Sequence, residues 1–149
     1  FDALTEFQPR SVEHNCKEIS KDVKPIRKDF SGKVYDYEDL VKNKRYCSNF
    51  NKKCYPAIMP MWDNTARRNH RGTIFHGATP NLYKQWLNAV INNVYTNHKL
   101  DEKRIFINAW NEWGEGAYME PDYGYGYAYL QATYDAMLGR ESNNNELDT

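Results

Sequence analysis

The stretch of this chain best suited to chemistry is residues 105–122, which reads Ile-Phe-Ile-Asn-Ala-Trp-Asn-Glu-Trp-Gly-Glu-Gly-Ala-Tyr-Met-Glu-Pro-Asp. Its apolar first part, 105–110, predicts a buried strand, and the remainder predicts a loop. Glu112 and Glu115 are three residues apart, and a turn containing Gly114 would bring both carboxylates to one side of that loop. Two carboxylates beside aromatic rings are typical of enzymes that act on sugars, in which one is the acid and the other assists at the ring.

The same pair of glutamates also has an ordinary interpretation, because carboxylates in a loop usually form a solvated surface. The aromatic residues around them favour the chemical interpretation. Trp110, Trp113 and Tyr118 are costly to expose unless they pack or bind something. Their flat apolar faces suit a pyranose ring. Glu112 and Glu115 are therefore candidate catalytic residues.

A second segment ends in polar side chains that could join this site. Residues 55–61 predict a strand that two prolines make irregular. The residues that follow it and could contact a ligand are Trp62, Asp63, Asn64, Arg67 and Arg68. Arginine suits a phosphate or a carboxylate ligand. Alternatively, Asp63 pairs with one of the two arginines and holds the loop.

The remaining elements predict how these loops are positioned. Residues 3–7 predict a short strand, with Glu6 and Arg10 at its end as either a surface pair or ligand contacts. A long loop is expected over 11–32, and 32–37 should lead into a helix. Helices are predicted after Asp36, after Thr79-Pro80, and over 125–138 up to Gly139; residues 45–51 are polar and end the first of them.

Three strands that alternate with three helices predict an α/β fold with a parallel sheet. Every candidate loop then follows the carboxyl end of a strand, where active sites lie in (β/α) barrels. Three such units cannot close an eight-stranded barrel, which takes about 250 residues.

Composition excludes several classes of protein. The chain has 149 residues with zero formal net charge, which argues against a nucleic-acid partner. There is no apolar run long enough for a transmembrane segment and no signal peptide. Three cysteines without paired spacing predict reduced thiols and a cytoplasmic setting. Four scattered histidines predict no metal site, and no cofactor is indicated.

Several blocks of the sequence together resemble one known family. Asn-Ala-Trp-Asn-Glu-Trp-Gly-Glu-Gly-Ala-Tyr-Met-Glu-Pro-Asp, followed by Tyr-Gly-Tyr-Ala-Tyr-Leu, resembles the signature of the WbsX-type glycosyltransferases. That family is similar to glycoside hydrolase family 99, the endo-α-mannosidases. Residues 1–10, 59–68 and 71–76 resemble earlier blocks in the family's order. The resemblance implies the last three β/α units of a TIM-type (β/α)8 barrel, with a barrel part at 1–140 and a polar tail at 141–149.

If that barrel assignment is right, the upstream part of the same barrel is a partner of this segment. Alone, the segment would expose a sheet edge and the apolar inner face of the sheet. We therefore expect it to be marginally stable, or to associate, on its own.

The resemblance also implies a mechanism. Glu112 would take the proton of the sugar 2-hydroxyl, whose oxygen attacks the anomeric carbon, and Glu115 would protonate the leaving oxygen. An acid in that role needs a raised pKa, and Trp113 beside it could supply the desolvation. Residues expected to contact substrate are Trp110, Asn111, Trp113, Tyr118, Glu120, Trp62, Asp63, Asn64, Arg67, Arg68 and Glu6. Tyr118 stands where the hydrolases carry a polar amide, which affects the expected sugar specificity.

Three functions remain open at this point. The first is a glycosyltransferase of polysaccharide or O-antigen (lipopolysaccharide) biosynthesis that takes a glycan or sugar donor, with any membrane association made through partners. The second is a retaining, endo-α-mannosidase-like hydrolase. The third is a carbohydrate-binding remnant without activity. The chain has no Asp-x-Asp metal motif and no Gly-rich phosphate loop.

Overall fold

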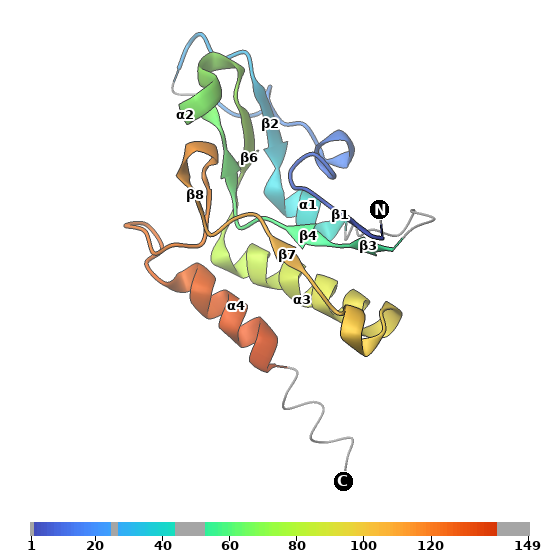
Figure 1. The fold of residues 1–149 in the computed structure, drawn as a ribbon. Coiled ribbons are helices and arrows are strands. Elements are labelled where there is room, and N and C mark those ends of the chain that lie inside the picture. The colour runs from blue at the N-terminus through green and yellow to red at the C-terminus, as the bar shows by residue number, and fades with distance from the viewer. Residues whose placement is uncertain (1, 25–26, 44–52, 140–149) are drawn as a thin grey trace.

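The computed structural model describes residues 2–24, 27–43 and 53–139 and has a mixed α/β fold (Figure 1). The strands are β1 (Leu4–Thr5), β2 (Lys33–Asp36), β3 (Cys54–Tyr55), β4 (Ala57–Ile58), β5 (Trp62–Asp63), β6 (Thr73–His76), β7 (Phe106–Ile107), β8 (Asn111–Glu112) and β9 (Ala117–Tyr118). The α-helices are α1 (Tyr37–Lys42), α2 (Thr65–Arg68), α3 (Pro80–Asn97) and α4 (Ala128–Leu138). Short 3-10 helices cover Glu13–Asn15, Asn69–Arg71, Leu100–Glu102 and Trp113–Glu115.

The three strands expected from the alternating pattern lie side by side in chain order. β1 pairs in parallel with β3, and β4 pairs in parallel with β7. The predicted strand over 55–61 is divided into β3 and β4 because Pro56 between them has no N–H to give to a ladder. Parallel pairing is therefore confirmed for these strands, which carry the candidate loops at their carboxyl ends.

A second sheet was missed by the sequence analysis. Its order is β2-β6-β5, with β2 and β6 parallel and β5 and β6 antiparallel. Residues 32–37 were expected only to lead into a helix, and 71–76 were given no strand. Each of these two strands has four residues, too few to show an alternating pattern. Contacts from distant sequence stabilise them, including the Tyr35 and Phe75 rings, whose centroids are 5.2 Å apart.

The strand predicted over 105–110 is shorter and more exposed than expected. Only β7 forms, and the Phe106 side chain is 47% exposed. Among the described residues β7 has a hydrogen-bonded neighbour, β4, on one edge only. The prediction of a buried strand is therefore wrong for this segment, since burial requires neighbours on both sides.

Helices α1, α3 and α4 begin close to where local signals place them, whereas α2 was missed because residues 62–68 were predicted to form a loop. The Asp36 carboxylate accepts hydrogen bonds from the backbone N–H groups of Glu38 and Asp39, and the Thr79 hydroxyl accepts one from Leu82. α4 begins three residues later than predicted, because a turn between Asp122 and Gly126 precedes it. Figure 1 shows α3 and α4 lying alongside one another beside the parallel strands. The core between α1, α3 and α4 includes Tyr37, Tyr83, Trp86, Val90 and Tyr129.

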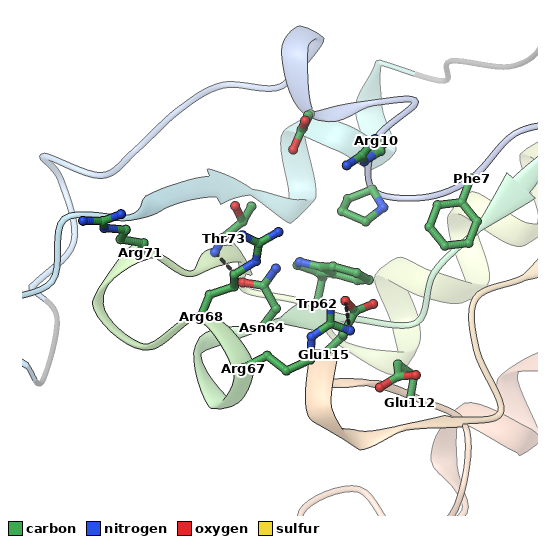
Figure 2. Close-up of a pocket in the computed structure, with 12 residues that line it drawn as sticks. Phe7, Arg10, Trp62, Asn64, Arg67, Arg68, Arg71, Thr73, Glu112 and Glu115 are labelled. Atoms are coloured by element: carbon green, nitrogen blue, oxygen red, sulfur yellow. Dashed lines mark hydrogen bonds and ion pairs between the residues drawn. The ribbon is translucent and has the colours of Figure 1, made fainter.

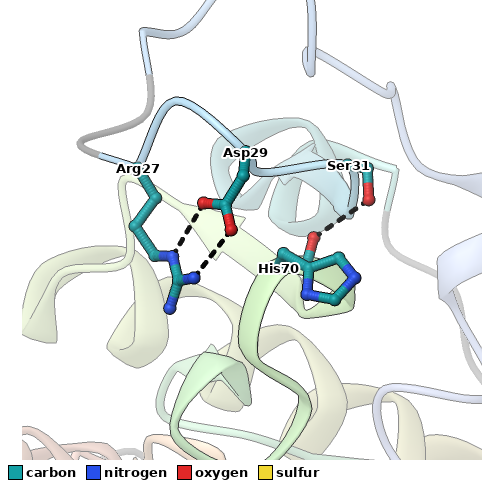
Figure 3. A network of polar contacts seen from close by, with 4 residues as sticks. All are labelled: Arg27, Asp29, Ser31 and His70. Carbon is teal, nitrogen blue, oxygen red and sulfur yellow. Dashed lines mark hydrogen bonds and ion pairs between the residues drawn. The ribbon is translucent and has the colours of Figure 1, made fainter.

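The long loop expected over 11–32 is present and is fastened to the second sheet. Glu18 forms an isolated bridge with Tyr35, and the Ser31 hydroxyl donates to the His70 carbonyl (Figure 3). Arg27 and Asp29 form an exposed ion pair at 2.8 Å within the same loop. The Glu18 bridge thus ties the loop to β2, and the Ser31 hydrogen bond ties it to the segment that follows α2.

The cysteines differ from expectation. Cys54 is disulfide-bonded, whereas the Cys16 thiol is not in a disulfide and donates a hydrogen bond to the Val12 carbonyl oxygen at 3.2 Å. The prediction of reduced thiols is therefore wrong for Cys54, and the cysteines no longer support a cytoplasmic setting. An odd number of cysteines does not exclude a disulfide, because the count does not say which thiols lie close together in the fold. None of the described helices combines the length and apolar character needed to cross a bilayer. The predicted polar segments 45–51 and 141–149 lie outside the described residues.

Candidate active site

A cleft of about 730 Å³ opens beyond the carboxyl ends of the parallel strands (Figure 2). It is built from the segment after β1, the region from β5 to β6, and the β8–β9 hairpin. Its lining residues are Phe7, Pro9, Arg10, Glu13, Trp62, Asn64, Arg67, Arg68, Arg71, Thr73, Glu112 and Glu115. Both candidate catalytic glutamates therefore face the same cavity.

The glutamates are carried by a small antiparallel hairpin. β8 pairs with β9, so that Asn111 lies opposite Tyr118 and Glu112 opposite Ala117. The 3-10 turn Trp113–Glu115 joins them and ends at Gly116, which has a φ of 56°. Glycine adopts this left-handed conformation without the cost that a Cβ brings.

The hairpin lies directly on β5. A Cβ on Gly116 would be 2.8 Å from the carbonyl oxygen of Asp63 and 2.9 Å from its nitrogen, so only glycine permits this approach. On the same side, Arg67 Nη1 lies 2.7 Å from Glu115 Oε1. Backbone proximity and an ion pair together fix the hairpin against β5 and α2.

Glu112 and Glu115 have different surroundings. Glu112 is exposed, and its carboxylate has no hydrogen bond or ion pair among the described residues. The Glu115 side chain is 15% exposed and forms an ion pair with Arg67. The ion pair with Arg67 therefore fixes where the Glu115 carboxylate lies in the cleft.

Trp113 lies on the opposite face of the hairpin from the two glutamates. Its ring stacks on Tyr118 with centroids 3.7 Å apart, and its indole Nε1 donates to Glu120 Oε2 at 2.7 Å. Trp113 and Tyr118 line a separate cavity of about 710 Å³. The structure thus does not place Trp113 over Glu115, and the expected desolvation of the acid by this ring is absent.

Trp62, Asp63 and Asn64, which follow β4, have different surroundings. Trp62 is buried in the cleft, and Asn64 Oδ1 accepts a hydrogen bond from the Thr73 backbone at 2.7 Å. Asp63 Oδ1 accepts from both the backbone and the hydroxyl of Thr65. Pairing of Asp63 with an arginine is therefore wrong, since the Asp63 carboxylate binds Thr65 at the start of α2 and Arg67 binds Glu115.

Other candidates lie outside this cleft. Trp110 and Asn111 are exposed, and neither lines it. The Trp110 carbonyl oxygen instead accepts hydrogen bonds from the backbone N–H groups of Met119 and Glu120. Sequence reasoning missed Arg71 and Thr73 as lining residues. No helical spacing could have joined Arg68 to Arg71, because Asn69 between them has a φ of 52° and interrupts the helical backbone.

Glu6 has a structural contact. Its Oε2 accepts a hydrogen bond from the Ala57 backbone at 3.0 Å, which ties the end of β1 to β4. The surface pair with Arg10 is absent. Burial raises the pKa of Glu6, and the Ala57 hydrogen bond offsets part of that rise. Within the described part of the chain, no group of three or more potential ligand side chains is arranged to hold a metal ion.

Comparison with known proteins places this site in a family. The family model described as Glycosyltransferase WbsX matches residues 1–133.

The chain belongs to the WbsX glycosyltransferase family.

Its curated relatives include the uncharacterized protein WxcX of Xanthomonas campestris pv. campestris, from two strains. Each is 36% identical to this chain over 137 residues, which are 92% of this chain and 19% of the relative. The chain therefore spans about one fifth of the length of these relatives. A solved structure described as a glycoside hydrolase-like protein shares 19% identity and a TM-score of 0.48, covering 67% of this chain and 31% of that one.

The contact between Gly116 and Asp63 predicts a large effect of one methyl group. Gly116→Ala should destabilise the fold by about 1–2 kcal/mol from the left-handed backbone and by a further roughly 1–3 kcal/mol from the clash. Gly126→Ala is the matched control, because Gly126 has a φ of 53° and open space around its Cβ position. Urea unfolding measures both. Equal losses in the two variants would contradict a tight hairpin contact.

Burial of Glu6 predicts a pH-dependent stability. Because the folded protein holds the Glu6 proton more tightly than the unfolded chain does, protonated Glu6 stabilises the fold. This stabilisation is complete below the ordinary pKa of 4.5 and is lost as pH rises through the raised pKa of the folded state. Glu6→Gln keeps an acceptor for Ala57 and should therefore gain stability relative to the parent between about pH 4 and about pH 7.

Glu102→Gln is the control of opposite sign for the Glu6 experiment. A hydrogen bond from Lys53 lowers the pKa of Glu102, so this carboxylate contributes stability above its ordinary pKa that is lost as pH falls. Urea midpoints across the pH range measure both variants. A Glu6→Gln curve parallel to that of the parent would show that Glu6 is not perturbed by folding.

Proposed function

We propose that this chain carries the catalytic glutamates of a carbohydrate-active enzyme that transfers a sugar to an acceptor in bacterial polysaccharide or O-antigen assembly. Membership of the WbsX glycosyltransferase family supports the substrate class. The observation that carries the proposal is the placement of Glu112 and Glu115 in one cleft of about 730 Å³. Pockets of this size accommodate a small ligand such as one or two sugar rings.

In the proposed transfer, the bond between the anomeric carbon and the leaving oxygen breaks, and the acceptor hydroxyl oxygen bonds to that carbon. Glu112, whose exposed carboxylate has no partner in the described residues, accepts the proton of the sugar 2-hydroxyl as that oxygen bonds to the anomeric carbon, and Glu115 gives a proton to the leaving oxygen. The acceptor oxygen then displaces the 2-oxygen from the anomeric carbon, Glu115 takes the proton of the acceptor, and Glu112 returns its proton to the 2-oxygen. Arg67 holds Glu115 in place until substrate arrives.

A hydrolase would use the same two carboxylates with water as acceptor. The unpaired arginines of the cleft favour transfer from an activated donor, since cleavage of a neutral glycan leaves them without a partner. A remnant that only binds sugar would need neither carboxylate for turnover. The three functions can therefore be distinguished by the products that form and by whether the glutamate variants lose turnover.

We further infer that the parallel strands are the last β/α units of a TIM-type barrel. β1, β3 with β4, and β7 lie in chain order, and the cleft is at their carboxyl ends. The outer edge of β7 carries an exposed Phe106 and has no paired strand among the described residues. A further strand of the same barrel would cover that edge.

Substitution of the glutamates tests the function. Glu112→Gln and Glu115→Gln should each lower turnover roughly a hundredfold or more, while sugar binding remains. Glu38→Gln is the control, because Glu38 pairs with Lys42 on α1 away from the cleft. Proton NMR follows new glycosidic signals with an activated sugar and an acceptor glycan. New reducing ends from an oligosaccharide alone would indicate a hydrolase, and unchanged turnover in both variants would show that these residues are not catalytic.

The barrel proposal predicts the behaviour of the isolated chain. Exposed strand edges are templates for pairing with other chains, so the chain alone should melt over a broad temperature range and self-associate with rising concentration. Scanning calorimetry with sedimentation measures both. A sharp, cooperative transition of a monomer, with equal calorimetric and van't Hoff enthalpies, would contradict the proposal.

A further inference from the structure

The arginines of this chain fall into two groups. Three of the described guanidinium groups have a partner: Arg27 with Asp29, Arg67 with Glu115, and Arg104 with the Tyr55 hydroxyl. The remaining described arginines, which make no ion pair or side-chain hydrogen bond with any described residue, all line the cleft; they are Arg10, Arg68 and Arg71. Unpaired cationic groups are thus concentrated in the cavity that holds the candidate catalytic glutamates.

These arginines come from separate elements and approach the cleft from different sides. Arg10 follows β1, Arg68 ends α2, and Arg71 lies in the 3-10 turn behind it. In Figure 2 the guanidinium groups of Arg10 and Arg68 reach into the space above the Trp62 ring, whereas Arg71 lies farther out and points away. Arg10 and Arg68 are therefore the lining arginines whose guanidinium groups face the space above Trp62.

Hydrogen-bond donors surround the same space. Asn64 Oδ1 is occupied by the Thr73 backbone, which leaves the Asn64 NH2 group as a donor. The Trp62 side chain is 5% exposed, and its indole Nε1 is a buried donor without a partner in the described residues. Buried donors are nearly always satisfied in folded proteins. This end of the cleft consequently lacks an acceptor, which a bound anion would provide.

The acidic lining residues lie mainly elsewhere. Glu112 and Glu115 belong to the hairpin, and Figure 2 shows them below Trp62, on the side away from Arg10. Glu13 is the exception, because it lines the cleft near the segment after β1 and would repel an anion. Above Trp62 the unpaired charges are therefore those of Arg10, Arg68 and Glu13, and their sum is positive.

We propose that Arg10 and Arg68 form a subsite for a phosphate group of the substrate, above Trp62, with the attached sugar extending to Glu112 and Glu115. Guanidinium groups bind phosphate through parallel, charge-assisted hydrogen bonds, which gives both affinity and orientation. The ligand class is a sugar activated by a phosphate or diphosphate. The proposal rests on the transferase function above and adds the chemical nature of its donor.

Titration calorimetry with inorganic pyrophosphate tests the subsite. The parent chain should bind it, and Arg10→Gln and Arg68→Gln should each weaken binding roughly tenfold or more, as expected for loss of hydrogen bonds to a charged group. Arg27→Gln is the matched control, since Arg27 is also exposed but pairs with Asp29 in the loop shown in Figure 3. Both cleft arginines are exposed, so these substitutions leave the core intact, and circular dichroism verifies this.

Two further ligands identify what carries the phosphate. A nucleoside diphosphate and a short prenyl diphosphate share the diphosphate and differ in the attached group. Tighter binding of either than of pyrophosphate, lost in Arg68→Gln, supports the subsite and names the donor. Absence of binding to the parent for all three, or equal affinities in parent and both cleft variants, would overturn it.

The result separates this inference from the proposed function. Pyrophosphate binding is an equilibrium that needs neither Glu112 nor Glu115, so Glu115→Gln should bind it as well as the parent does. Loss of turnover in the glutamate variants with unchanged pyrophosphate affinity in the arginine variants supports the enzyme and overturns the subsite. The opposite pattern supports the subsite and overturns the catalytic role of the glutamates.

Discussion

The cleft depends on how closely the β8–β9 hairpin approaches the backbone of Asp63. Gly116 makes that approach possible, because any Cβ there would fall within 2.8 Å of a carbonyl oxygen. At this separation the Arg67 guanidinium reaches Glu115, and the turn presents Glu112 to the same cavity. Close backbone contact therefore determines the electrostatics of the site.

Local signals in the sequence were sufficient for the helix starts but insufficient for the second sheet. Asp36 and Thr79 satisfy N–H groups two or three residues away, so their role can be read without knowing the fold. β2 and β6 form because segments distant in sequence bury Val34, Tyr35 and Phe75. Such burial cannot be predicted from the four residues of each strand alone. Pairing of strands in parallel was predictable, because alternation of elements constrains it.

The site was predictable in composition and not in geometry. Glu112, Glu115, Arg67 and Arg68 could be named from their types and from a family resemblance, whereas Arg71 was missed. Which carboxylate Arg67 binds is decided by the docking of a hairpin more than 40 residues later in the chain, whereas sequence proximity had favoured Asp63. Likewise, the position of Trp113 beside Glu112 and Glu115 in sequence suggested a shared environment. The 3-10 turn instead places the indole and the carboxylates on opposite sides.

That two-sided hairpin has a consequence for how such proteins diversify. One face bears the carboxylates of the cleft, and the other bears the stacked Trp113 and Tyr118, fixed by Glu120 and lining a cavity of their own. Substitutions on the aromatic face leave the carboxylate contacts untouched, provided the glycines are kept. A loop of only eight residues, 111–118, thus separates one surface of stacked rings from another of carboxylates, so either surface can change without the other.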